Sequence, residues 1–401
     1  MYETEDRLGF NQTYMTETPW SDEYIQLAEK DFKAEKEPYT ETYVNATILP
    51  PSSPLPGFPW GLGGVVTEGG QYVDLSGIKG AFGGSYPFDS ETVEYIDEPI
   101  IYIGMVPNHW GHFLIDSVCR LWYILENKWD GKIAFCGIYW KEPEISGNFL
   151  EIFSLLGIKK ENLLYITEPK RFKEIVIPSP TMSFAISFHE KFKDTVDRII
   201  QAAMKKAEEK NLRSFEKIYF TRRSFKVAQR KEVGEKEVEE LFRNNGFQIL
   251  APEKLSVVEQ IYYIHTCKYM VSMSGTIPHN VIFASKGVKL VILNRTCEPN
   301  WPQFLINQLF DVDCTYVDCF MPWMIRHAEP YGKGVIWVGV TPNLKHFLED
   351  NRLRFQSKNT VQRGILFLRQ LCMVQLLRGG LLLMNFLPRF KRLLKLTNLV
   401  K

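Results

Sequence analysis

The sequence predicts an α/β protein that contains a parallel sheet and ends in a basic helical tail. Short apolar runs of strand length alternate with amphipathic helical segments over residues 216–293, a pattern typical of parallel strands with helices on both faces. The length of 401 residues suggests two domains. The last part of the chain, residues 351–401, contains no Asp or Glu and carries eleven Lys and Arg side chains among many leucines.

The charge of the chain is divided unevenly. Its net value of +1 is the sum of −10 over residues 1–350 and +11 over residues 351–401. With 45% hydrophobic and 24% charged residues, the composition excludes a disordered or collagen-like chain. The sequence therefore predicts an acidic globular body with a basic amphipathic tail at residues 346–401.

The first part of the body is expected to become more regular along the chain. Residues 1–90 are acidic and loop-rich, because prolines and glycines cluster between positions 50 and 90. A first domain at residues 91–212 follows. Its expected strands are 100–106, 132–138, 163–166 and 174–177, and its expected helices are 111–127, 149–156 and 190–211.

A second domain is expected at residues 213–345. Its expected strands are 217–221, 247–250, 269–273 and 288–293, with helices at 235–244, 257–266 and 277–284. Ser256 and Glu259 form a capping-box pattern at the start of the second helix. Ligands of such sheets bind at the carboxyl ends of the strands, so the residues that follow the strands are the candidates for a site.

The start of the helix at 111–127 carries the first such candidates, His109, His112 and Asp116. His112 and Asp116 are four residues apart and share the helix face opposite the apolar stripe. This arrangement suggests a general base that deprotonates an acceptor hydroxyl, with His112 and Asp116 both possible as the base. A solvated helix face is the plain alternative.

Basic residues follow the strand at 217–221. Arg222 and Arg223, with Arg230 beyond them, could hold a diphosphate through bidentate hydrogen bonds. A solvated basic loop is the alternative. Glu253 is a further candidate, since it follows the next strand.

The turn after the strand at 269–273 reads Ser274-Gly275-Thr276 and leads into a helix with His279 and Asn280. Hydroxyls and free amides at a helix start can bind the phosphates of a nucleotide sugar, although Ser, Thr and Pro are also common at ordinary helix starts. No GxGxxG or GxxxxGK[ST] pattern occurs, which disfavours a Rossmann dehydrogenase or a kinase.

Four ordered blocks together resemble glycosyltransferase family 61. They are residues 109–116 (HWGHFLID), 219–223 (YFTRR) with Arg230, 246–261 (GFQILAPEKLSVVEQI) and 274–283 (SGTIPHNVIF). The chain departs from the family in two places. A His-Gly-Ala-Gly run common in the family is Ser274-Gly275-Thr276-Ile277 here, and the Asn of an Asn-Glu pair is Gly234.

The resemblance implies a GT-B-like fold of two facing Rossmann-type domains and an inverting transfer of sugar from a nucleotide donor, without a metal or other cofactor. The first domain would bind the acceptor and the second the nucleotide sugar. Arg222 and residues 274–280 would then hold the donor, and residues 112–116 would face the reaction centre. No Asp-x-Asp signature stands out in the sequence and HExxH spacing is absent, so arginines in place of a cation would carry the phosphate charge.

The tail and the N-terminus indicate where the protein works. Residues 1–10 lack the features of a signal peptide, which favours the cytoplasm. Residues 363–401 are expected to bind an anionic membrane surface at its inner face, or else to pack on the acidic body; nucleic acid is disfavoured because stacking aromatics are not interleaved with the basic residues.

The sequence thus predicts a transferase that extends a surface glycan, such as a capsule or lipopolysaccharide, on a glycan or lipid-linked acceptor. Two other functions stay open. One is a catalytically silent glycan-binding or assembly subunit of the same fold, suggested by the altered His-Gly-Ala-Gly run. The other is a metal-dependent hydrolase built on His109, His112 and Asp116.

Overall fold

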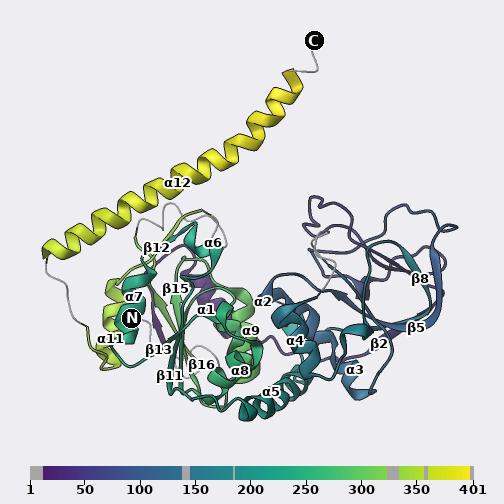
Figure 1. Ribbon diagram of the computed structural model, residues 1–401, viewed down its shortest axis with the longest axis horizontal. Helices are drawn as coiled ribbons and strands as arrows, with labels where there is room; N and C mark the ends of the chain where they lie inside the picture. Colours follow the sequence, from purple (N-terminus) through teal and green to yellow (C-terminus); the bar gives the residue numbers. More distant parts are fainter. Residues whose placement is uncertain (1–11, 138–144, 184–185, 323–333, 356–359, 398–401) are drawn as a thin grey trace.

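A computed structural model describes residues 12–137, 145–183, 186–322, 334–355 and 360–397, with the side chains of the last helix placed up to residue 379. Its strands form two main sheets that lie side by side, with α2 (Trp110–His112) and α4 (Gly147–Leu155) between them (Figure 1). The predicted α/β class with parallel sheets is confirmed.

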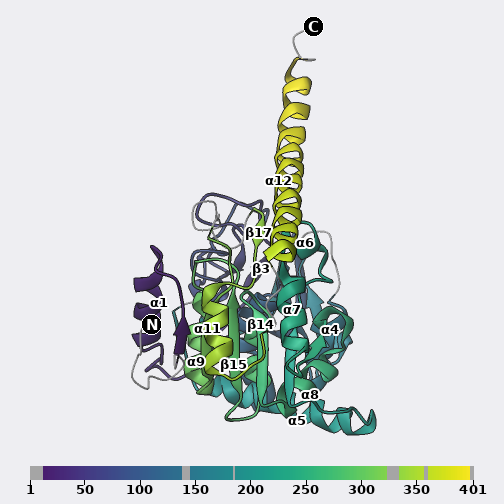
Figure 2. The same ribbon diagram turned by 90° about the vertical axis from the view of Figure 1, so that its left-hand side faces the viewer.

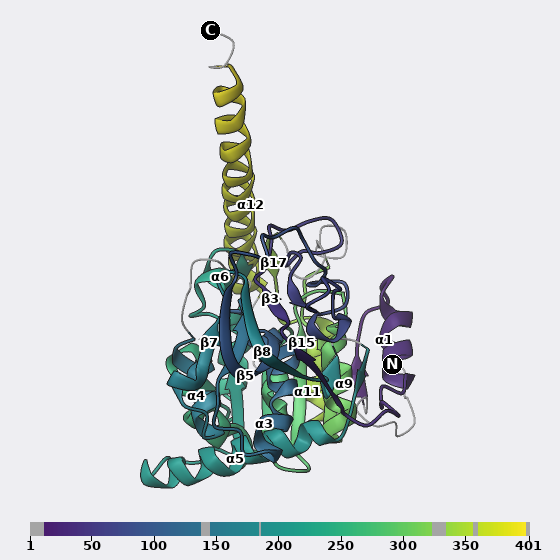
Figure 3. The same cartoon turned by 90° about the vertical axis from the view of Figure 1, so that its right-hand side faces the viewer.

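The first sheet is mixed. Its strands are β2 (Thr40–Val44), β3 (Thr47–Leu49), β4 (Gly64–Val66), β5 (Glu94–Met105), β6 (Ile133–Cys136), β7 (Leu163–Tyr165) and β8 (Lys170–Pro178). Strands β8, β5, β6 and β7 are parallel neighbours, whereas β2 and β3 pair antiparallel with β8. Figure 3 looks onto this sheet from the side of β8 and β5. The antiparallel strands β2, β3 and β4 come from residues 1–90, the segment that was predicted to be loop-rich with short strands.

The helix that follows β5 is irregular, although one regular helix was predicted at 111–127. It consists of α2, a π-helical turn (Phe113–Ser117), a 3-10 turn (Val118–Arg120) and α3 (Trp122–Glu126). The Ser117 hydroxyl donates to the Met105 carbonyl over 2.8 Å, which ties the π-helical turn to the end of β5. The long helix α5 (Lys191–Glu209) then lies against α3, α4 and α8 (Val257–Thr266).

The second sheet is entirely parallel. Its order is β13 (Gln248–Leu250), β11 (Lys217–Phe220), β14 (Tyr269–Met273), β15 (Lys289–Asn294), β16 (Asp313–Asp318) and β1 (Gln12–Tyr14). The strand that comes first in this part of the chain, β11, is thus flanked by β13 and β14, and the direction of winding reverses between β11 and β14. Strand β1, which lies near the N-terminus of the chain, pairs with β16 and forms the edge of the sheet opposite β13.

Helices cover both faces of the second sheet, because its strands are apolar on both sides. Ile218 and Phe220 of β11 face a core shared with the helices of the first sheet, whereas Tyr219 faces a separate core with Val238 and Trp337. The helices of this part are α1 (Ser21–Glu29), α7 (Glu235–Arg243), α8, α9 (Trp301–Phe310), α11 (Pro342–Asp350) and the 3-10 turn Pro278–Phe283. Smaller elements are α6 (Lys226–Gln229), the 3-10 turns Asp74–Ser76, Lys160–Asn162 and Pro252–Lys254, and the two-stranded pairs β9 (Met182–Ser183) with β10 (Ser187–Phe188) and β12 (Glu232–Val233) with β17 (Ile336–Trp337).

The chain ends in α12 (Thr360–Thr397). Its first turns lie on the second sheet's side of the body, and the rest extends away from both sheets (Figures 1 and 2). Val374 is fully buried, and the Gln370 side chain accepts a hydrogen bond from Trp337 Nε1 and donates one to Glu237. Over the described residues, the structure contains no helix with the length and apolar character needed to cross a membrane.

Candidate active site

A hollow of about 450 Å³ lies where the irregular helix of the first part meets the carboxyl end of the second sheet. The side chains that line it come from both parts of the chain. The lining residues used below are His109, Gly111, His112, Arg222, Ser274, Gly275, Thr276, His279 and Arg295, and Glu298 and Asn300 also line the hollow.

The strand order of the second sheet explains the position of this hollow. Arg222 follows β11, Ser274 follows β14 and Arg295 follows β15, so all three stand at the carboxyl edge. The first two flank the point at which the winding direction reverses, where neighbouring loops diverge and leave room for a ligand. The predicted position at the strand ends is therefore where the structure has its hollow.

His112 and Asp116 form a hydrogen-bonded pair on one turn of the irregular helix. His112 Nδ1 lies 2.8 Å from Asp116 Oδ2. The side chain of His112 is 27% exposed and lines the hollow, whereas that of Asp116 is only 4% exposed and lies behind it. The carboxylate can hold the imidazole in one orientation and leave Nε2, the opposite ring nitrogen, directed away from Asp116.

Two other aromatic rings contact His112. The His109 ring lies with its centroid 5.0 Å away, and burial, followed by the neighbouring His112, lowers the pKa of His109. Trp60 meets the His112 ring edge-on at 4.7 Å. Trp60 comes from the proline- and glycine-rich segment, so this segment takes part in shaping the site.

Arg222 and Arg295 share one buried carboxylate, Glu232. Arg222 donates to both of its oxygens, through Nε at 3.1 Å and Nη2 at 3.0 Å, and Arg295 Nη1 donates to Oε1 at 2.8 Å. Burial, then the nearby Arg222, lowers the pKa of Arg295 to about 10, a value at which it stays charged at neutral pH. Within this cluster, two guanidinium cations and one carboxylate leave a charge of +1.

The turn after β14 brings backbone close to these arginines. Gly275 has a φ of +135°, and a Cβ there would lie 3.2 Å from Arg295 Nη2 and 3.4 Å from Arg222 Nη1. Arg295 Nε also donates to the Ser274 carbonyl over 2.6 Å. The helix expected after this turn is only the six-residue 3-10 turn Pro278–Phe283, so the guanidinium groups are the main source of positive charge here.

His279 and Asn280 join the two parts of the chain. Asn280 Oδ1 accepts a hydrogen bond of 2.7 Å from Trp110 Nε1. His279 is buried and its Nδ1 lies 2.8 Å from Gln303 Oε1; burial lowers the pKa of His279 to about 4, so the ring is neutral at pH 7. His279 lines the hollow, whereas Asn280 supports its wall.

Gly234 and Glu235 lie beneath Arg222. Gly234 has a φ of +100°, and a Cβ there would collide with the Val338 carbonyl oxygen at 1.8 Å, which explains a glycine at this place in the chain. Glu235 accepts a hydrogen bond of 2.9 Å from the backbone N–H of Arg222. Burial raises the pKa of Glu235 to about 7.

Besides Asn280, three other predicted donor residues do not line this hollow. Arg223 pairs with Glu239 at 3.2 Å, and Arg230 is exposed on the turn after α6. Glu253 lines a different hollow between the two parts of the chain. Among the residues that the structure describes, no group of three or more His, Cys, Asp or Glu side chains is arranged to hold a metal ion.

The sequence prediction missed Arg295, Glu232 and Trp60. Arg295 follows β15 as Arg222 follows β11, so the same rule applied to every strand end would have found it. Glu232 and Trp60 carry no comparable signal, since their roles depend on contacts between distant parts of the chain.

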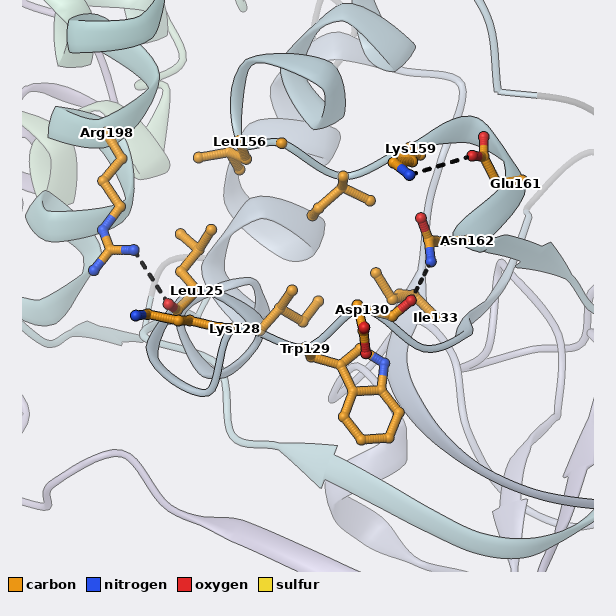
Figure 4. A pocket seen from close by; sticks show the side chains of 13 residues that line it. Leu125, Lys128, Trp129, Asp130, Ile133, Leu156, Lys159, Glu161, Asn162 and Arg198 are labelled. Atoms are coloured by element: carbon orange, nitrogen blue, oxygen red, sulfur yellow. Dashed lines mark hydrogen bonds and ion pairs between the residues drawn. The ribbon is translucent and has the colours of Figure 1, made fainter.

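A larger hollow, of about 520 Å³, lies near the starts of β6 and β7 (Figure 4). It is lined by surface groups such as Arg198, which donates to the Leu125 carbonyl, and Lys159, which lies 3.9 Å from Glu161. These contacts are local, and none of the predicted site residues lies there.

Fold and site together define an α/β protein with a hollow at the carboxyl edge of a parallel sheet, bordered by a His–Asp pair and by buried arginines. Residues 110–291 match the family described as Glycosyltransferase 61. The predicted resemblance to this family is thereby confirmed over these residues. The match includes His112, Asp116, Arg222 and residues 274–280, and it ends before Arg295. No curated protein matches the chain.

Proposed function

We propose that this protein is an inverting, metal-independent glycosyltransferase that moves a sugar from a nucleotide sugar to a glycan acceptor. The observation that carries the proposal is the meeting, in one hollow, of the His112–Asp116 pair with the Arg222–Glu232–Arg295 cluster. A transfer with inversion needs a base at the acceptor hydroxyl and positive charge at the departing diphosphate.

The arginines are suited to the diphosphate. Their guanidinium groups are held in place by Glu232 before any ligand binds, so little ordering is required when the phosphates arrive. The hydroxyls of Ser274 and Thr276 supply further hydrogen-bond donors at the same edge. In this arrangement the arginines take the part that a divalent cation takes in other transferases.

His112 is better placed than Asp116 to act as the base. The acceptor oxygen attacks the anomeric carbon from the face opposite the phosphate and passes its proton to His112 Nε2. The bond between that carbon and the phosphate oxygen breaks, and its electron pair leaves on the diphosphate, next to Arg222 and Arg295. Asp116 acts through His112, since it orients the ring and stabilises the imidazolium that forms.

The two sheets support a GT-B-like arrangement. The carboxyl end of the parallel part of the first sheet and that of the second sheet both border the region around residues 106–112. The first part would present the acceptor and the second the donor, as the family resemblance implies.

Helix α12 supports a place at the inner face of the cell membrane. Its exposed apolar side chains include Val361, Ile365 and Leu368, and residues 351–401 carry +11. Such a helix binds an anionic lipid surface through apolar burial and charge together. We accordingly propose a cytoplasmic, peripherally attached enzyme that extends a lipid-linked capsule or lipopolysaccharide glycan.

A thermal-shift screen of nucleotides and nucleotide sugars tests the donor site. A ligand that binds only the native state raises the melting temperature, by an amount that depends on the ratio of its concentration to Kd. We expect at least one nucleotide sugar to stabilise the wild type and not Arg222→Ala, while Arg198→Ala, which alters an exposed arginine, behaves as the wild type. Absence of any shift at millimolar ligand would contradict the proposal.

A measurement of turnover distinguishes a glycosyltransferase from a catalytically silent subunit of the same fold. Release of nucleotide from the stabilising nucleotide sugar, with or without added glycan, is expected in the presence of a chelator as well as in its absence. Binding without any release would favour the silent glycan-binding subunit, and loss of release on chelation would contradict metal independence.

A further inference from the structure

A second hollow, of about 430 Å³, lies beside the candidate active site. It is formed at the carboxyl ends of β5, β6 and β7, because Val106 and Gly137 follow the first two strands and Tyr165 ends the third. These three strands are parallel neighbours, and the carboxyl edge of parallel strands is where α/β proteins bind ligands. Glu253, from the second part of the chain, closes the hollow on its other side.

The lining of this hollow combines flat apolar faces with a few polar groups. Aromatic rings are contributed by Phe135, Phe149 and Tyr165, and polar side chains by Asn108, Asn148 and Glu253. The Phe135 and Tyr165 rings lie 5.4 Å apart. A sugar ring presents C–H groups on one face and hydroxyls at its edge, so it can lie against an aromatic ring and donate to amide and carboxylate oxygens.

The two hollows adjoin each other. Asn108 lines the second hollow and the next residue, His109, lines the first. Trp110 stands between them, because its ring lies 5.5 Å from that of Phe149 and its Nε1 donates to Asn280. A sugar in the second hollow would therefore have one end close to His109 and His112.

We propose that the second hollow binds the terminal, uncharged sugar of the acceptor glycan, with Glu253 as a specificity-determining residue. This inference rests on the proposed glycosyltransferase function. Glu253 is the carboxylate among the described lining residues, and an exposed carboxylate accepts hydrogen bonds from sugar hydroxyls while it repels the carboxylate of a uronic acid. The sequence prediction had assigned Glu253 to the donor site, whereas in the structure Glu253 lines the second hollow and not the candidate active site.

Saturation-transfer NMR and thermal shift with defined sugars test this inference. The probes are methyl glycosides of glucose, galactose, mannose, rhamnose and N-acetylglucosamine, compared with methyl glucuronide. We expect at least one neutral glycoside to bind at millimolar concentration and glucuronide to bind more weakly. Glu253→Gln should weaken the neutral glycoside on the order of tenfold, since a hydrogen bond to a charged group is lost.

Reversal of the charge at residue 253 should change which sugar binds more tightly, a change that would not be expected if Glu253 only supported the fold. Glu253→Lys is expected to bind glucuronide more tightly than the neutral glycoside, whereas Glu161→Gln, an exposed carboxylate in the hollow of Figure 4, should leave both affinities unchanged. The inference is overturned if no neutral glycoside binds the wild type, or if neither Glu253 variant changes the order of affinities.

Nucleotide binding, measured on the same samples, separates this inference from the proposed function. Glu253 variants should keep the nucleotide-induced thermal shift, and Arg222→Ala should lose that shift but keep the glycoside. Glycoside binding that depends on Glu253 in a protein that binds no nucleotide would keep the sugar site and reject the transferase. Nucleotide binding without any glycoside binding would keep the proposed transferase and reject the sugar site.

Discussion

Side-chain exposure separates the roles of His112 and Asp116, two residues that the sequence alone treats as equivalent. The imidazole borders the hollow, while the carboxylate is 4% exposed and contacts the ring at 2.8 Å. A group that takes a proton from a substrate has to reach it. Asp116 is therefore a positioning residue in the proposed mechanism, and His112 is the group that meets the acceptor.

His112→Ala is expected to lower kcat by about 10²–10⁴-fold, the usual contribution of a general base. Asp116→Asn should lower kcat as well, because the ring loses the carboxylate that stabilises its charged form. Donor affinity should stay near the wild-type value in both. Steady-state kinetics with thermal-shift measurement of donor binding checks this, with His346→Ala, which alters an exposed histidine of α11, as the control. Near-normal turnover of His112→Ala would remove His112 as the base.

Gly111 is a point of close contact between the two parts of the chain. A Cβ at this position would lie 2.6 Å from Thr276 Cγ2 and 3.2 Å from His279 Cδ2. Gly111→Ala should therefore lower the free energy of unfolding by about 1–3 kcal/mol, the usual cost of overpacking. Denaturant unfolding measures this change.

A second substitution tests whether Thr276 is the group that resists the added methyl. Thr276→Ser removes Cγ2, so the double variant Gly111→Ala with Thr276→Ser should recover part of the lost stability. Gly364→Ala is the matched control, since its Cβ would meet nothing within 4 Å and alanine favours a helix. Equal stability of Gly111→Ala and the wild type would mean that the two parts are not held as closely as the structure has them.

At the scale of elements, the parallel strands were the most predictable feature. The bounds of β14 agree with the prediction, and the Ser256–Glu259 capping box is present, with Ser256 N donating to Glu259 Oε2 at 2.8 Å. Buried parallel strands are apolar on both faces and are bordered by turns, so local sequence defines them well. The rule that ligands bind at strand ends then predicted the positions of Arg222 and Ser274.

Elements that depend on distant partners were less predictable. Strand β1 is stabilised by pairing with β16 across about 300 residues of sequence, as in the match of Thr13 with Tyr316. The irregular course of Phe113–Ser117 likewise depends on the contact of Ser117 with the end of β5. Local periodicity contains no information on either contact.

The first residue of α7 makes stability depend on pH. Burial raises the pKa of Glu235 from 4.5 to about 7, so the folded protein keeps a proton that the unfolded chain releases between these values. Because the folded state then binds more protons, its stability falls as the pH rises from about 4.5 to 7. The loss from this group alone is on the order of 3 kcal/mol.

Glu235→Gln should flatten this part of the pH profile. The amide oxygen can still accept from the Arg222 N–H, and it carries no charge to desolvate. Denaturant unfolding from pH 4.5 to 7.5 measures the slope, with Glu240→Gln on the same helix as the control. Burial also raises the pKa of Asp318 to about 7. Both variants should therefore keep some loss of stability with rising pH. An unchanged slope in Glu235→Gln would show that Glu235 does not hold the proton.

At the scale of the whole molecule, the near-zero net charge conceals two opposed parts. The excess of positive charge lies in residues 351–401, and most of these residues form a helix that starts on the body and extends beyond it (Figure 2). The buried Val374 and the Gln370 hydrogen bonds to Trp337 of β17 and Glu237 of α7 attach its first half to the body. The neighbouring Ile365, Leu368 and Leu376 are 60–72% exposed, so one apolar side of the attached half faces away from the body.

Truncation after residue 379 removes the extended half of α12 and keeps the contacts of Val374 and Gln370. Each basic residue near an anionic surface contributes about 1 kcal/mol, so loss of the five Lys and Arg side chains beyond this point should abolish most binding to vesicles that contain phosphatidylserine or phosphatidylglycerol. Cosedimentation measures the bound fraction, which for the full chain should fall as salt is raised, because counterions screen the attraction. Nucleotide release should be retained, since the hollow lies elsewhere in the molecule.

The double variant Ile365→Ser with Leu368→Ser tests the apolar part of the same interaction at constant charge. It should weaken vesicle binding without changing its dependence on salt, because only the buried apolar area is reduced. A truncated protein that sediments as the full chain does would show that the extended half of α12 does not contribute to vesicle binding.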